Sequence, residues 1–179
     1  MSEVTAASTP VALADRPAPA RPKRSGQRKV RKYALDLLFA ADLRQVPVSQ
    51  VLATYAELNQ APPPARAVDL AEGVAAQIDA IDACLTPALA PGWSVERMPS
   101  IDRNLARLAC YEMLYHAIAP GVAISEAVGL AEELSTEASA GFLSGLLHRV
   151  AQQSEPDEAR EADMWEDEAG EDEGGHDAG

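Results

Sequence analysis

Residues 21–45 read RPKRSGQRKVRKYALDLLFAADLRQ, so that a block of cations passes directly into an apolar pattern. Seven of the fifteen Lys and Arg residues of the chain lie between Arg21 and Lys32, with no acid among them. From Val30 onward, apolar residues recur at i, i+4, i+7, i+8 and i+11, which is one face of an α-helix. The stretch therefore predicts a helix that docks on a core and carries cations around its first turns.

The position of these cations points to an anionic ligand. Cations at a helix N-terminus oppose the helix dipole by about 0.3–1 kcal/mol, so helix stability does not account for them. A charge run is commonly a solvated tail or a localisation peptide, but this one leads into a docking face. Tyr33 and Phe39 lie just inside the helix, and aromatic rings beside cations favour single-stranded RNA or DNA over a duplex. Phe39 is equally compatible with a place in the core.

Charge is distributed unevenly along the 179 residues, although the net charge is -13. Residues 1–32 hold eight cations and two acids, residues 33–153 hold six and fourteen, and residues 154–179 hold one and twelve. The molecule is therefore predicted to be dipolar, with a basic N-terminal end that the net charge conceals.

Composition divides the chain into three parts. Residues 1–24 are rich in Ala and Pro, and residues 154–179 are rich in acids and Gly. Neither segment carries enough apolar material to offset the entropy of ordering. We therefore predict a helical domain over residues 25–153 between a disordered basic arm and a disordered acidic tail.

Apolar periodicity and the positions of Pro and Gly predict an all-α fold of about six or seven helices. After the first helix, we expect a short turn at residues 93–98 and helices over residues 47–58, 68–85, 101–118, 122–135 and 138–153. The helix at 101–118 is apolar on more than one side and is expected to be central. No segment alternates with period two over enough residues to predict a strand.

An inventory of reactive residues gives no catalytic site, no metal site and no cofactor site. Cys84 and Cys110 lack the spacing of a metal or disulfide framework. Cys110 and His116 are six residues apart on one helix, so their side chains diverge by about 120° and do not form a nucleophile and base pair. The sequence shows neither a secretory signal nor a membrane span, which predicts a cytoplasmic protein without a membrane partner.

Glu112 stands in the most apolar predicted helix. A carboxylate there has two interpretations: an acid with a raised pKa, or one half of a structural ion pair. We favour the ion pair, with Arg103 or Arg107 as its partner.

Four segments resemble, in order, the bacterial transcription antitermination factor NusB family: residues 27–39, 93–114, 122–131 and 141–147. The resemblance implies an all-helical fold of two small sub-bundles. It also implies a non-catalytic function, the binding of boxA-type single-stranded leader RNA of ribosomal-RNA operons together with the ribosomal protein NusE. The partner in the cell is then the RNA polymerase antitermination complex, which reads through terminators.

The resemblance also implies site residues. It places RNA contacts on Arg28, Lys29, Arg31, Phe39 and Phe142, and Lys32 completes the basic block. Ser144 stands where the family has Asn, which weakens the case for an RNA contact there. The resemblance implies that Asp102, Glu112 and Glu126 lie toward the NusE surface. Some family members form homodimers that bury the RNA face, so a homodimer is a further candidate assembly.

The sequence is also compatible with two other functions. One is a helical module that binds only proteins, and the other is the RNA-binding module of an RNA cytosine methyltransferase. The second is disfavoured because we find no Rossmann-type catalytic segment. The acidic tail suggests a further hypothesis, competition with RNA for the basic block, beside the simpler role of a solubilising tail.

Overall fold

The computed structural model describes residues 24–58 and 61–154. Within these ranges the chain forms seven α-helices, two short 3-10 helices and no strand, which confirms the all-α prediction. The elements are α1 Arg24–Arg44, α2 Val48–Glu57, α3 Ala65–Ala76, α4 Ile78–Leu85, η1 Thr86–Ala88, η2 Val95–Arg97, α5 Ser100–Tyr115, α6 Pro120–Leu134 and α7 Glu137–Ser154. The two predicted tails lie outside the described residues, except for Arg24 and Ser154.

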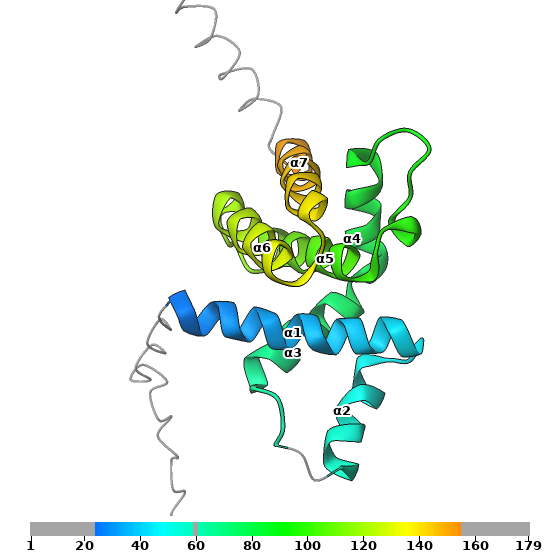
Figure 1. Cartoon of the computed structure of the whole chain (residues 1–179), viewed down its shortest axis with the longest axis vertical. Coiled ribbons are helices and arrows are strands. Elements are labelled where there is room, and N and C mark those ends of the chain that lie inside the picture. The colour runs from blue at the N-terminus through cyan, green and yellow to red at the C-terminus, as the bar shows by residue number, and fades with distance from the viewer. Residues whose placement is uncertain (1–23, 59–60, 155–179) are drawn as a thin grey trace, which may run out of the picture.

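The helices gather into two sub-bundles (Figure 1). α1 packs against α2, α3 and α5, while α5 also packs against α4, α6 and α7. The contacts of α1 and α3 with α5 therefore join the two groups, in agreement with the two sub-bundles that the family resemblance implied.

The core follows the predicted apolar faces. On α1, the residues Ala34, Leu37, Leu38 and Ala41 are at most 8% exposed. On α5, every residue from Asn104 to Cys110 is buried. A helix that is buried all round must have neighbours on all sides, and this is why α5 is central.

The single helix predicted over residues 68–85 is wrong, because the chain breaks at Gln77 into α3 and α4. Gln77 has φ -112° and ψ 17°, and its N–H donates to the carbonyls of both Gly73 and Val74. Val74 and Ile81 are both fully buried and seven residues apart, so the apolar stripe continues through the break and hides it from the sequence. The break lets α3 pack on α1 while α4 packs on α5 and α7.

The boundary between α5 and α6 also differs from the prediction. α5 ends at Tyr115 rather than Ile118, because Ala117 adopts a left-handed φ of 48°. α6 then begins at Pro120, where the fixed φ of proline suits the first turn of a helix. The residues between α5 and α6 are therefore not helical, and they line a surface beside α1 and α3.

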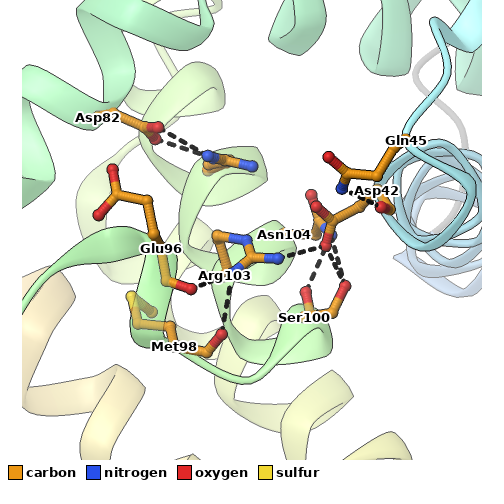
Figure 2. A network of polar contacts seen from close by, with 9 residues as sticks. Asp42, Gln45, Asp82, Glu96, Met98, Ser100, Arg103 and Asn104 are labelled. Atoms are coloured by element: carbon orange, nitrogen blue, oxygen red, sulfur yellow. Dashed lines mark hydrogen bonds and ion pairs between the residues drawn. The ribbon is translucent and has the colours of Figure 1, made fainter.

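A polar network holds the end of α1 to the start of α5 (Figure 2). The Asp42 carboxylate accepts hydrogen bonds from Arg103 Nη2 at 2.6 Å, from Asn104 Nδ2 at 3.4 Å and from the Ser100 hydroxyl. Burial raises the pKa of Asp42, but the hydrogen bonds from Ser100 and Arg103 outweigh it and hold that pKa below its ordinary value. The charged Asp42 therefore fixes the two sub-bundles to one another at this point.

None of the helices in the described ranges is long and apolar enough to cross a membrane.

Candidate nucleic-acid interface

The four cations of the predicted RNA-binding block face different directions around α1. Consecutive helical residues are rotated by about 100°, so Arg28 and Lys32 share one side while Lys29 lies on another. Arg31 points inward and is 4% exposed, whereas Lys29 is exposed. The block is therefore not one continuous cationic surface.

Arg28 and Lys32 are held against α6. Arg28 Nη2 donates to the Gly129 carbonyl at 2.6 Å and lies 3.6 Å from Glu133 Oε2. Lys32 Nζ lies 2.5 Å from Glu133 Oε1. The hydrogen bond and charge of Lys32, followed by the charge of Arg28, hold the pKa of Glu133 below its ordinary value. Glu133 therefore neutralises much of this side of the block while leaving both cations at the surface.

The approach of Arg28 to α6 depends on Gly129. A Cβ at residue 129 would lie 2.7 Å from Arg28 Nη1, closer than side-chain carbons approach other atoms. The missing side chain thus lets the guanidinium reach the helix backbone. Sequence reasoning missed both Gly129 and Glu133. The available signal was their i, i+4 spacing, which matches the spacing of Arg28 and Lys32.

Arg31 forms the interior part of the block. Its Nε donates to both oxygens of Glu112, at 3.0 and 2.9 Å, and its Nη1 lies 3.7 Å from Glu126 Oε2. Arg31 and Glu112 are 5% and 7% exposed at their side chains. The Glu126 Oε2 atom is buried and has no hydrogen-bond donor in the described part of the chain. Arg31 therefore ties α1 to α5 and α6.

The predicted ion pair of Glu112 is confirmed, but its predicted partners, Arg103 and Arg107, are wrong. Each is turned by roughly 140–180° from Glu112 around α5, so both point away from it. Arg103 pairs with Asp42, and Arg107 donates to both oxygens of Asp82 at 2.8 and 2.6 Å.

Lys29 differs from the other three cations. Its ammonium lies 5.9 Å from the centroid of the Tyr33 ring, a weak cation–π contact. Within residues 24–58 and 61–154 it has no hydrogen bond or ion pair. Lys29 is therefore the member of the block that can meet an anion without first leaving a carboxylate.

The predicted aromatic contacts are half-buried. Phe39 lies eleven residues after Arg28, which returns it to the same side of α1 about 16 Å along the helix. Phe142 is on α7 and packs against the core. Arg28 and Ser144 also line an open groove of about 500 Å³ along α6 and α7, together with Gly121, Ile124, Ser125, Val128, Gly129, Glu132 and His148.

The residues expected at the NusE surface form contacts within the chain. Asp102 is 3% exposed and accepts hydrogen bonds from the hydroxyls of Ser135 at 2.6 Å and Ser139 at 2.8 Å. It thereby fixes the turn between α6 and α7 to α5. Glu112 is buried with Arg31, and Glu126 is 17% exposed at its side chain.

The reactive residues are not arranged for catalysis in the described part of the chain. Burial raises the pKa of the Cys110 thiol to about 12, so it stays protonated and is a poor nucleophile. His116 contacts the Tyr111 ring edge-on, at 5.0 Å between centroids. No group of three or more His, Cys, Asp and Glu side chains is placed to hold a metal ion among the described residues.

The fold and the basic helix together define a class, the small all-helical proteins of two sub-bundles whose first helix carries the cations. The chain belongs to the NusB family, whose sequence model matches residues 28–152. It is 53% identical over 130 residues to the transcription antitermination protein NusB of Salinispora tropica, over 70% of this chain and 95% of that protein. The family is one of non-catalytic antitermination factors.

Solved structures give the same fold. The chain is similar to NusB of T. maritima with 29% identity and a TM-score of 0.62, over 75% of this chain and 96% of that one. It also shares its fold, at 22% identity and a TM-score of 0.62, with a chain in the crystal structure of the antitermination factors NusB and NusE in complex with double-stranded RNA. That match covers 73% of this chain and 99% of the other.

Proposed function

We propose that this protein binds boxA-type single-stranded leader RNA of ribosomal-RNA operons together with NusE. It acts in the cytoplasm as part of the RNA polymerase antitermination complex. Two findings support the proposal: membership of a family of transcription antitermination proteins, and a shared fold with a chain crystallised in a complex of NusB, NusE and double-stranded RNA.

The observation that carries the proposal is the side of α1 that presents Arg28, Lys32 and Phe39. The two cations are 41% and 42% exposed at their side chains, and Arg28 borders the open groove along α6 and α7. Surface cations on the same side of a helix as an aromatic ring provide phosphate contacts and a stacking surface for unpaired bases.

The proposed roles follow from the contacts of each residue. Lys29 meets a phosphate directly, whereas Arg28 and Lys32 must exchange Glu133 for a phosphate. Phe39 and Phe142 stack on bases. Arg31 meets no phosphate, because it is buried against Glu112, where it holds the first turns of α1 in place.

We propose that the protein partner binds a surface whose shape depends on buried residues underneath it. Asp102 fixes the turn between α6 and α7, and Glu112 and Glu126 fix α1, so each shapes the surface without lying on it. A homodimer that covers the RNA side is the competing assembly. If it forms, RNA should convert dimer to monomer in size-exclusion chromatography with light scattering.

The test is a titration of a boxA-type single-stranded RNA, with a scrambled RNA and a duplex as competitors. The triple substitution Arg28→Ala, Lys29→Ala and Lys32→Ala should weaken binding at least about thirtyfold and flatten the dependence of log Kd on log salt. The matched control Arg44→Ala removes a cation from the far end of the same helix and should change Kd less than about twofold. Equal affinity for the scrambled RNA would contradict boxA specificity.

A protein-interaction module is the second candidate function. The observation that favours it is the neutralisation of three of the four predicted RNA-binding cations by Glu112 and Glu133. In that case NusE should bind equally well to the wild type and the triple variant, and neither should bind RNA. The methyltransferase module is not supported, because the similar proteins are antitermination factors.

A further inference from the structure

A small pocket lies beside the first turns of α1, between α3 and the C-terminal end of α5. Its volume is about 120 Å³. Val30, Leu70 and Ile118 provide apolar walls, and all three are half-buried and pack against the core. The pocket is separate from the groove along α6 and α7, with which it shares no lining residue.

The size of the pocket matches one six-membered ring. An apolar cavity of about 150 Å³ is known to hold benzene, and a water molecule takes up about 30 Å³ of liquid. A space of about 120 Å³ that is partly open to solvent therefore accepts a single flat ring whose remaining atoms project outward. A fused two-ring base would not fit wholly inside.

The charges around the pocket cancel. Arg31 is paired with Glu112, and the exposed Arg66 is matched by the exposed Asp69. A phosphate or an ammonium group would find as much repulsion as attraction there. A ring that is neutral but polar would not be repelled.

Arg31 supplies unused hydrogen-bond donors to this site. A guanidinium carries five N–H groups; in Arg31 the Nε group donates to Glu112 and Nη1 lies 3.7 Å from Glu126 Oε2, which leaves Nη2 without a hydrogen bond or ion pair to another residue of the described chain. The side chain is 5% exposed, so its remaining donors have little access to bulk water. A donor with little access to water favours an acceptor such as a ring carbonyl oxygen. The half-buried Gln27 adds an amide that can both donate and accept.

We propose that this pocket binds one unstacked pyrimidine base of a single-stranded RNA. The ring lies between the walls formed by Val30, Leu70 and Ile118, and its carbonyl oxygens accept hydrogen bonds from Arg31 and Gln27. The proposal rests on the proposed RNA-binding function and assigns a base-reading site on a different side of α1 from the cations that meet phosphates.

The first test fills the pocket without removing a cation. Leu70→Phe in the full chain should weaken binding of the boxA-type RNA about tenfold. Leu52→Phe, at another half-buried leucine that packs on the core but lies outside the pocket, should change Kd less than about twofold. Thermal unfolding of both variants shows whether each is folded.

An abasic scan then locates the base. Each nucleotide of the RNA is replaced in turn by an abasic one, and one position should cost the wild type about tenfold. In Leu70→Phe the same abasic RNA should bind no worse than the intact RNA, because the pocket is already closed. If the penalty persists in Leu70→Phe at every position, the pocket does not hold a base and the inference is overturned, while RNA binding itself still stands.

A second measurement does not depend on RNA binding. Free uridine, cytidine, adenosine and guanosine are titrated into the full chain, and the Gln27 side-chain amide and the Leu70 and Ile118 methyl signals are followed by NMR. The pyrimidine nucleosides should shift these signals in the wild type but not in Leu70→Phe. Absence of any shift up to the solubility limit overturns the inference. So does a result in which Leu70→Phe abolishes NusE binding but leaves RNA binding intact, because the pocket would then hold a protein side chain.

Discussion

The ion pairs of this protein form a series in burial. The side chains of Arg31 and Glu112 are 5% and 7% exposed, those of Arg103 and Asp42 are 14% and 15%, and those of Lys32 and Glu133 are 42% and 46%. A buried pair cannot exchange its partner without leaving a desolvated charge, whereas an exposed pair can. Neighbouring cations of one basic block therefore have different roles, since Arg31 maintains the fold and Lys32 remains available to a ligand.

The largest effect is expected at the buried end of the series. Arg31→Ala should lower the free energy of unfolding by about 3–5 kcal/mol, because Glu112 would remain buried without a cation. Denaturant unfolding measures the loss. The matched control is Lys29→Ala, two residues earlier on the same helix and exposed. This variant should change the free energy of unfolding by at most about 0.5 kcal/mol. Equal small effects for both variants would show that Arg31 is not buried in solution.

An intermediate effect is expected at the joint between the sub-bundles. Asp42→Asn should lower the free energy of unfolding by about 1–3 kcal/mol at pH 7, because hydrogen bonds from Arg103 and Ser100 lose their charged acceptor.

The pH dependence of that difference identifies its cause. The pKa of Asp42 is below its ordinary value of 3.8, so its stabilisation is fully present above that value and is lost as the pH falls through the lower folded-state pKa. Unfolding measured from pH 7 down to the acid transition should show the two proteins converging only below about pH 4. A difference that is constant over the whole range would point to packing rather than charge.

At the exposed end, the expected effect is on binding rather than stability. Glu133→Gln should free Arg28 and Lys32 for phosphate contacts and tighten binding of the boxA-type RNA about three- to tenfold. The melting temperature should change little. Glu72→Gln removes the same charge from an exposed position on α3 and serves as the control in the same titration. A weaker affinity for Glu133→Gln would mean that Glu133 positions the cations instead of competing for them.

The smallest effect concerns the acidic tail, which apart from Ser154 lies outside the described ranges. Residues 154–179 hold twelve acids and one Arg, and a tether of opposite charge would compete with RNA for the exposed cations but not for Arg31. Deletion of this segment should tighten RNA binding about two- to fivefold at low salt and have no effect at high salt. Unchanged affinity at low salt would leave the segment a solubilising role only.

Periodicity predicted α1, which buries one clear face, and α5, which is buried on all sides. α1 and α5 followed from the spacing of Ala34, Leu38 and Leu105 with their neighbours, because burial of an apolar stripe decides where a helix lies. The break at Gln77 was not predictable in this way, since Val74 and Ile81 keep the same phase on both sides of it. Only the difference in neighbours, α1 beside α3 and α7 beside α4, requires the break.

The sequence predicted which residues form the site more successfully than it predicted the contacts that they make. The block of cations was evident, but its pairing with Gly129 and Glu133 depends on how α6 lies against α1. The inward direction of Arg31 was available from the sequence, because Arg31 precedes Ala34 and Leu38 by three and seven residues and so belongs to their face. The prediction gave more weight to the positive charge of Arg31 than to its position on the apolar face.

The pairing of Arg31 with Glu112 joins residues that are 81 positions apart. A ribosome adds residues at about 5–20 per second, so Glu112 is made several seconds or more after Arg31. Throughout that interval the nascent chain displays Arg31 to the surrounding water and to any nearby polyanion. The arginine leaves that exposed state only when the central helix has been synthesised, so this domain cannot complete its folding early in translation.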